Sequence, residues 1–172
     1  MSLSSCSVEF AEKVRDAVGR TECPVPMEPF SPGEEVFLIG NGGSCAVASH
    51  IATDMMKFQK VPAHVLTDPA IMSCFANDYG YENALREAIA RYIGVGGIGL
   101  ICISSSGRSK NIIKAAAFAQ SRGAYVVTFT GFDADNPLRA IGDCNYWVPS
   151  HNYGVVEIAH LTILHSIVNP GE

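Results

Sequence analysis

A chain of 172 residues, 48% of them hydrophobic and 17% charged, has the size and apolar content of a globular domain and not of a disordered segment. Its 12 Lys and Arg residues are outnumbered by 17 Asp and Glu residues, and the net charge of −5 excludes a nucleic-acid-binding protein of the usual basic kind. Ordinary domains have about 25% charged residues, so this low fraction indicates surface that is buried between copies of the chain.

Neither a membrane helix nor a secretory signal is predicted. The uncharged run at 92–106 contains four glycines and is well short of the roughly 20 continuous apolar residues that cross a membrane. The N-terminus has charged residues spaced through it and lacks the basic-then-apolar layout of a signal peptide. We therefore expect a cytoplasmic protein with no membrane partner.

The six cysteines form no CxxC pair, and several lie in apolar runs. We expect them to be reduced core residues. The alternative is that one cysteine is a catalytic nucleophile, and Cys45 is the candidate because it lies in a glycine-rich turn.

Short apolar runs alternate with helical patterns along the chain. An amphipathic helix is predicted at 3–19, and the four prolines of 20–34 predict a linker between this helix and the body of a single domain, 35–172. Strands are predicted at 36–39, 65–66, 100–103, 125–130 and 146–148, and further helices at 44–58, 81–92, 109–122 and 153–168. This alternation predicts an α/β fold with a parallel sheet that is covered on both faces, because the strands are apolar throughout.

Two of the predicted strands run directly into turns, and ligands of open α/β sheets bind at such carboxyl ends. The first turn, 40–44, reads Gly-Asn-Gly-Gly-Ser, and its glycines let backbone amides approach a ligand closely. It matches neither GxGxxG nor a P-loop. A tight turn that needs glycine for its dihedral angles and an anion site both remain open for it.

The second turn, 103–109, supplies serine hydroxyls at Ser104, Ser105, Ser106 and Ser109 just before a predicted helix. The first turn of that helix offers unpaired N–H groups and the positive end of its dipole, so a phosphate monoester fits here without lysine. In the alternative, one serine caps the helix and the others are solvated. We favour phosphate binding.

Ionisable side chains recur on two predicted helices. His50 and Asp54 are four residues apart on one helix face. Glu157 and His165 are eight residues apart, about 80° around the helix, whereas His160 is about 140° from His165 and is not expected to converge with it. A carboxylate and an imidazole on each helix form a candidate four-ligand site for zinc or another divalent ion. The alternative is that each histidine is a core or interface residue and that Asp54 joins a surface ion pair.

Three motifs resemble the sugar isomerase (SIS) domain, and more narrowly its phosphoheptose isomerase (sedoheptulose 7-phosphate isomerase) branch. They are Gly-Asn-Gly-Gly-Ser at 40–44 followed by His50, Asn-Asp-Tyr-Gly-Tyr at 77–81, and Ile-Ser-Ser-Ser-Gly-Arg-Ser at 103–109. The resemblance runs from about Glu35 to the C-terminus. It implies a flavodoxin-like three-layer α/β/α fold with a five-stranded parallel sheet, to which the N-terminal helix is added. It also implies a homotetramer with active sites between subunits.

The resemblance also implies site residues. Asp54 and His165 match the catalytic glutamate and histidine of the branch, and His50, Asp54, Glu157 and His165 match side chains through which some members bind zinc. The serine turn, helped by Ser44, would hold the phosphate of a sugar. The expected substrate and phosphate contacts are Asn41, Gly42, Gly43, Ser44, Asn77, Asp78, Ser104, Ser105, Ser106, Arg108, Ser109 and Glu157.

Five positions depart from the pattern of the branch. Asp54 replaces a glutamate, Glu157 a glutamine, Gly154 an aspartate, Phe58 an arginine and Arg108 an asparagine. A second carboxylate favours divalent-metal binding, and Arg108 adds a cation beside the phosphate. These changes surround the reacting end of the sugar and leave the glycine turns intact.

The leading hypothesis is an enzyme that interconverts an aldose and a ketose phosphate through an enediol, acting on sedoheptulose 7-phosphate or a related sugar phosphate. Asp54 or Glu157 is then the base, His165 the acid/base partner, and a metal at His50 the electrophile. A second hypothesis is a non-catalytic sugar-phosphate sensor or a replication-initiation-associated assembly protein. The two histidines count against it, because a pure binder does not need them.

Overall fold

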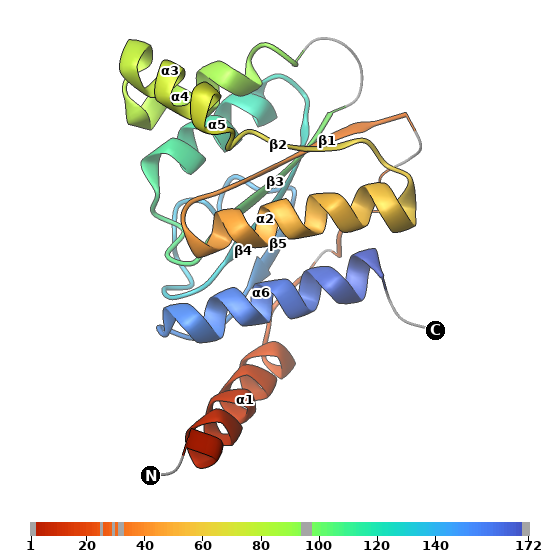
Figure 1. The fold of residues 1–172 in the computed structure, drawn as a ribbon, viewed down its shortest axis with the longest axis vertical. Helices are drawn as coiled ribbons and strands as arrows, with labels where there is room; N and C mark the ends of the chain where they lie inside the picture. Colours follow the sequence, from red (N-terminus) through yellow and green to blue (C-terminus); the bar gives the residue numbers. More distant parts are fainter. Residues whose placement is uncertain (1–2, 25, 29, 31–32, 94–97, 170–172) are drawn as a thin grey trace.

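A five-stranded parallel sheet forms the middle layer of the computed structural model, which describes residues 3–24, 26–28, 30, 33–93 and 98–169 (Figure 1). The strands are β1 (Glu35–Gly40), β2 (Ala63–Val65), β3 (Ile98–Ser104), β4 (Tyr125–Thr130) and β5 (Cys144–Trp147). Their order is β2-β1-β3-β4-β5, and every neighbouring pair is parallel. The predicted α/β fold is confirmed, and this strand order is the flavodoxin-like one, which changes direction between β1 and β3.

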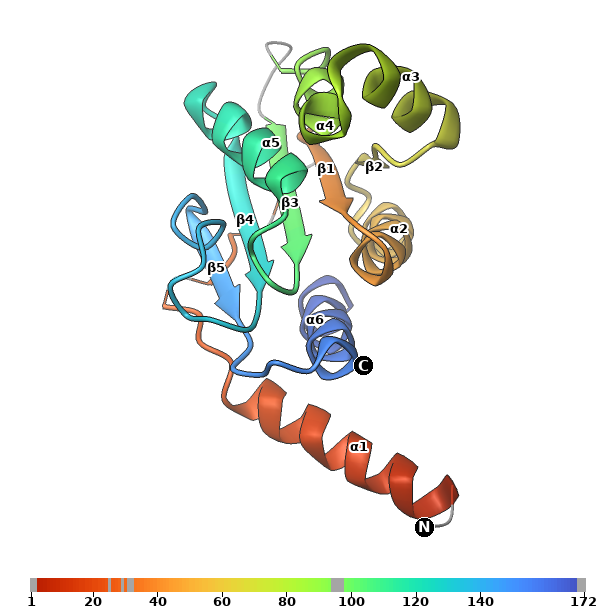
Figure 2. The same ribbon diagram turned by 90° about the vertical axis from the view of Figure 1, so that its left-hand side faces the viewer.

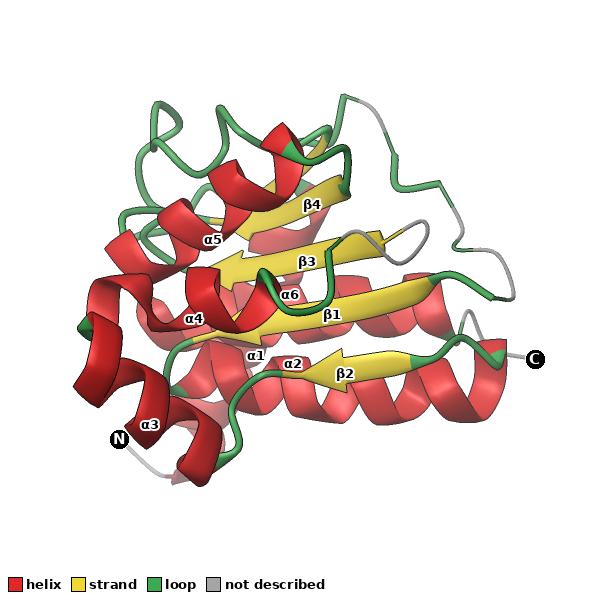
Figure 3. Cartoon of the chain, turned by 90° about the horizontal axis from the view of Figure 1, so that it is seen from above, coloured by secondary structure: helices red, strands yellow, loops and turns green. Residues whose placement is uncertain are grey.

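Helices cover both faces of the sheet, as the view from above shows (Figure 3). One face carries α2 (Gly43–Asp54) and α6 (Tyr153–Val168), and the other carries α4 (Tyr81–Ile89), α5 (Lys110–Ser121) and α3 (Pro69–Tyr79). In β1, Val36 and Leu38 are buried on the α2 side, and Phe37 and Ile39 on the α5 side. Successive strand residues point to opposite faces, so a strand covered on both sides is apolar throughout.

The N-terminal helix α1 (Leu3–Gly19) spans the predicted residues and projects from the body, with its end nearest the body beside α6 (Figure 2). It buries Val14 and Ala17. The linker after it pairs Glu22 with Trp147 in an antiparallel bridge, which covers the outer edge of β5. Linker residues 25, 29, 31 and 32, the glycine-containing segment 94–97 and the C-terminal 170–172 lie outside the described residues.

The helices differ from the prediction in three places. The patterns predict no helix at 69–79, where α3 lies. Asp68 and Pro69 mark the start of this helix. The Asp68 carboxylate accepts hydrogen bonds from two backbone N–H groups of the first turn, and Pro69 occupies the first helical position. The helix predicted at 44–58 is α2 followed by a π-helical turn, η1 (Met55–Gln59), and the one predicted at 81–92 ends at Ile89. None of the helices in the described part of the chain has both the length and the hydropathy needed to cross a membrane.

Candidate functional site

The glycine turn (40–44) after β1 and the serine turn (103–109) after β3 lie next to each other where the strand order changes direction. They enclose, with the start of α6, a cavity of about 320 Å³. Its lining residues are Asn41, Gly42, Gly43, Ser44, Ile103, Ser104, Ser105, Ser106, Ser109, Tyr153 and Glu157. Sequence reasoning missed Ile103 and Tyr153. Tyr153 had a signal, because it begins a predicted helix that must start at the carboxyl edge of the sheet.

Close packing explains the composition of the glycine turn. A Cβ on Gly40 would lie 2.6 Å from the carbonyl carbon of Ser44, so no side chain fits there. Asn41 and the buried Asn111 exchange hydrogen bonds through their side-chain amides, at 3.0 and 2.9 Å, and Tyr81 Oη also donates to Asn41 Oδ1 at 2.9 Å. Asn41 thereby joins the glycine turn to the start of α5 and fixes one wall of the cavity.

The serine turn brings buried hydroxyls to the cavity. Ser104 and Ser105 are each 5% exposed, and Ser104 Oγ donates to Ser109 Oγ at 3.3 Å. Within the described structure the Ser105 hydroxyl has no hydrogen-bond partner, whereas most buried polar side chains have one. The helices α2, α5 and α6 all begin around this cavity, and the free N–H groups and positive dipole ends of their first turns favour an anion.

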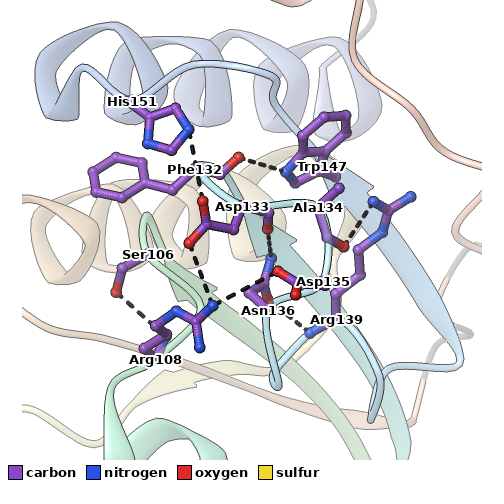
Figure 4. A network of polar contacts seen from close by, with 10 residues as sticks. All are labelled: Ser106, Arg108, Phe132, Asp133, Ala134, Asp135, Asn136, Arg139, Trp147 and His151. Atoms are coloured by element: carbon purple, nitrogen blue, oxygen red, sulfur yellow. Dashed lines mark hydrogen bonds and ion pairs between the residues drawn. The ribbon is translucent and has the colours of Figure 1, made fainter.

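Arg108 belongs to the serine turn, but its side chain does not line the cavity. Its Nη2 atom lies 3.3 Å from Asp133 Oδ2 and 3.7 Å from Asp135 Oδ1 in the loop after β4 (Figure 4). In this structure, therefore, the cation expected beside the phosphate is paired with two carboxylates instead.

His50, Asp54 and His165 come together between α2 and α6. Asp54 Oδ2 lies 3.6 Å from His50 Nε2 and 3.3 Å from His165 Nδ1, and the two imidazole ring centres are 5.0 Å apart. The π-helical turn η1 directly follows Asp54, and Gln59 Nε2 at its end donates to the carbonyl oxygen of Ile167 on α6 at 3.3 Å. This hydrogen bond joins η1, the continuation of α2, to the end of α6.

The donor atoms of this cluster fit a divalent metal ion. One ligand atom from each of His50, Asp54 and His165 lies within 4.8 Å of the other two. Two imidazole nitrogens and one carboxylate oxygen are the donor types found in three-residue zinc sites that keep an open position. The side chain of Asp54 is 14% exposed and that of His50 is 54% exposed, so the cluster is open to ligands from one side.

Glu157, the fourth predicted metal ligand, is not a member of this three-residue cluster. Its carboxylate lies directly over Gly43, where any Cβ would collide with it. Glu157 lines the serine-turn cavity and also a groove of about 260 Å³ between α2 and α6, which His50 lines as well. It therefore lies between the cavity and the cluster.

The remaining predicted residues lie apart from the cavity. Asn77 and Asp78 are exposed on α3, where Asn77 Nδ2 donates to Asp78 Oδ1 at 2.9 Å, and neither lines the cavity. Cys45, the alternative nucleophile, does not line it either. His160 is fully buried and its Nε2 lies 3.0 Å from the carbonyl oxygen of Thr130. Burial lowers the pKa of His160 to about 4, although this hydrogen bond partly opposes the shift.

The structure shows the contacts of two further positions that differ from the pattern of the branch, Gly154 and Phe58. A Cβ on Gly154 would lie 3.3 Å from Phe10 Cζ, so the glycine lets α1 approach α6 closely. Phe58 is exposed on η1, and the Lys57 ammonium lies 4.9 Å from the centre of its ring.

Sequence comparison connects this chain with sugar-phosphate enzymes. Residues 27–131 match the family model of the SIS domain. The phosphoheptose isomerase of Fusobacterium nucleatum is 35% identical over 144 residues, which cover 81% of this chain and 73% of that protein. The phosphoheptose isomerase of Roseiflexus sp. is 35% identical over 147 residues, which cover 82% of this chain and 74% of that protein.

Solved structures of phosphoheptose isomerases are also similar to this chain. A phosphoheptose isomerase from Neisseria gonorrhoeae aligns with a TM-score of 0.71 at 29% identity, over 79% of this chain and 75% of that one. One from Francisella tularensis aligns with a TM-score of 0.73 at 25% identity, over 93% of this chain and 83% of that one. These likenesses show that the chain belongs to the SIS-domain family, in its phosphoheptose isomerase branch.

Proposed function

We propose that this protein interconverts the aldose and ketose forms of a phosphorylated sugar, with sedoheptulose 7-phosphate as the first substrate to test. The observation that carries the proposal is the path from the serine-lined cavity, past Glu157, to the cluster of His50, Asp54 and His165. One end of this path suits a phosphate and the other suits proton transfer. Relatives named phosphoheptose isomerase support the same reaction.

The phosphate is proposed to occupy the cavity between the glycine and serine turns. Ser44, Ser104, Ser105, Ser106 and Ser109 offer hydroxyl groups there, and three helices start around it. Hydroxyls and helix N-termini together bind phosphate without a lysine. Fixing the phosphate holds the rest of the sugar in one orientation, which lowers the entropic part of the reaction barrier.

The distance between the two ends favours a sugar with several carbons. Gly43 begins α2 at the cavity and His50 lies two turns further along, about 10 Å along the helix axis. The groove between them has apolar walls, to which Val47 and Leu161 contribute, and Glu157 lines both this groove and the cavity. We propose that sugar hydroxyls contact the Glu157 carboxylate and that C1 and C2 lie beside the cluster.

Isomerisation requires a base that moves a proton between C1 and C2 and an acid that serves the two sugar oxygens. Asp54, the counterpart of the glutamate of the branch, is the proposed base, and Glu157 is the alternative. His165 turns Nδ1 toward Asp54 at 3.3 Å, which leaves Nε2 for the sugar oxygens. A divalent ion, zinc in the first place, held by His50, Asp54 and His165 would polarise the sugar carbonyl and stabilise negative charge on its oxygen.

We further propose that the protein assembles as a homotetramer. Val8 and Phe10 on α1 are exposed, and no residue of α3 is fully buried within the single chain. Exposed apolar helices on a chain with few charges favour burial between copies. Light scattering after size exclusion should give four times 18.3 kDa, and a monomer at micromolar concentration would contradict this assembly.

A panel of phosphorylated sugars tests the function. The protein is incubated with pentose, hexose and heptose phosphates, with and without added zinc, and aldose and ketose are separated by chromatography. Interconversion of at least one sugar, lost on replacement of His165 by alanine, is the expected result. Tight binding of a sugar phosphate with no interconversion on any member of the panel would favour the non-catalytic sensor instead.

A further inference from the structure

Arg108 is a cation in the middle of the serine turn, yet it faces away from the cavity. Its backbone N–H donates to Ser106 Oγ at 3.3 Å, so the residue is anchored beside serines that line the cavity. Its guanidinium instead meets the loop 131–138, which we call the Asp133 loop, through contacts with Asp133 and Asp135 (Figure 4). In this structure the guanidinium pairs with these two carboxylates and not with a group of the cavity lining.

The Asp133 loop is held firmly on the serine turn. Backbone N–H groups near both of its ends donate to carbonyl oxygens of the serine turn, at 2.9 and 3.1 Å. Phe132 has a φ of +55°, which bulky residues rarely adopt, and Trp147 Nε1 donates to its carbonyl oxygen at 3.3 Å (Figure 4). The carboxylate of Asp133 is therefore presented from a fixed backbone, whereas Arg108 reaches it with a flexible side chain.

The contacts that hold Arg108 are of the kind that exchanges easily. A single nitrogen makes both of them, at 3.3 and 3.7 Å, and the side chains of Arg108, Asp133 and Asp135 are 53%, 50% and 90% exposed. Exposed ion pairs of this kind contribute little to the free energy of folding. A phosphate dianion, by contrast, matches the planar guanidinium with two parallel hydrogen bonds and more charge.

We propose that Arg108 is a movable phosphate ligand, held by Asp133 and Asp135 while the cavity is empty and transferred to the phosphate when a sugar phosphate binds. Asp133 is then a positioning residue that sets how tightly phosphate binds, because its carboxylate competes with the ligand for the same guanidinium. This inference rests on the proposed phosphate cavity and deepens it. It does not depend on turnover.

A double-mutant cycle with inorganic phosphate as the probe tests the proposal by titration calorimetry at low salt. Asp133→Asn should tighten phosphate binding by roughly twofold to fivefold, since the competing pair is weak. Arg108→Gln should weaken it by about tenfold. In the Arg108→Gln background, Asp133→Asn should have no further effect, because the guanidinium for which Asp133 competes is gone.

Asp16→Asn is the matched control, since it removes one negative charge from an exposed ion pair with Arg20 on α1, and it should leave phosphate affinity unchanged. An equal gain from Asp133→Asn in both backgrounds would overturn the proposal and indicate simple charge repulsion. An unchanged affinity in Asp133→Asn, with phosphate binding intact, would overturn it as well and leave the proposed isomerase untouched. Absence of phosphate binding in every variant would contradict the phosphate cavity itself.

Discussion

Replacing Ser105 by alanine should weaken ligand binding without lowering the stability of the fold. The Ser105 hydroxyl is buried and has no partner within the described structure, and a buried hydroxyl left without a partner costs about 1–3 kcal/mol. Its removal should keep the free energy of unfolding or raise it by about 1 kcal/mol, which for a chain of this size is about 2–4 °C in Tm. If the hydroxyl donates to a bound phosphate, the same change should weaken sugar-phosphate binding by between roughly tenfold and a hundredfold.

Thr130 provides the matched control for this experiment. Its hydroxyl is also buried without a partner within the described residues, but Thr130 does not line the cavity. Thr130→Val should therefore keep or raise Tm and leave the affinity for sugar phosphate unchanged. Scanning calorimetry of both variants measures Tm, and titration calorimetry measures their affinity for sugar phosphate. Unchanged affinity in Ser105→Ala, or equal losses in the two variants, would refute the role of the Ser105 hydroxyl as a phosphate donor.

Three further predictions concern the packing and chemistry around the site. Gly107 has a φ of +62°, and a Cβ on it would collide with the buried Asn136, so Gly107→Ala should lower the free energy of unfolding by about 2–4 kcal/mol in urea titrations; a change within 0.5 kcal/mol would contradict this packing. Asp54→Asn should bind zinc at least tenfold more weakly, measured by metal analysis after dialysis against a competing chelator, and equal retention would exclude Asp54 as a ligand. Because burial lowers the pKa of His160 to about 4, the unfolded chain takes up a proton as pH falls from about 6.5 while the folded chain does not. Stability should drop by up to roughly 3 kcal/mol between pH 6.5 and 4 through this group, and His160→Gln should flatten that part of the profile measured by urea unfolding.

Sequence patterns predicted those parts of the molecule that depend on local chemistry. The glycine and serine turns are recognisable because their composition and their place after apolar strands already define a close backbone approach and an anion-binding helix start. The helix at 69–79 is absent from the prediction although Ile71, Phe75 and Tyr79 recur every four residues, and none of its residues is fully buried. Asp68 and Pro69 add the signal of a helix start to this spacing.

The positions of Glu157 and Arg108 depend on the tertiary structure. A helical wheel gives the angle between Glu157 and His165 but not the separation of about 12 Å along the axis, and the Glu157 carboxylate lies over Gly43 and outside the cluster. The direction of the Arg108 side chain is set by carboxylates that follow it by 25 residues or more in the sequence. These carboxylates lie in a loop that hydrogen bonds to the serine turn hold in place. Neither contact has a signature in the local sequence.

Incorporation of solvent deuterium tests the proposed proton transfer most directly. Sedoheptulose 7-phosphate and the other sugar phosphates that bind are incubated in D₂O, and NMR follows deuterium at C1 and C2. The wild-type protein should introduce deuterium at one of these carbons. His165→Ala should bind the same sugar phosphate with little change in affinity and introduce none. Equal deuterium uptake in His165→Ala, or none in the wild-type protein with any sugar phosphate that binds, would contradict isomerisation at this cluster.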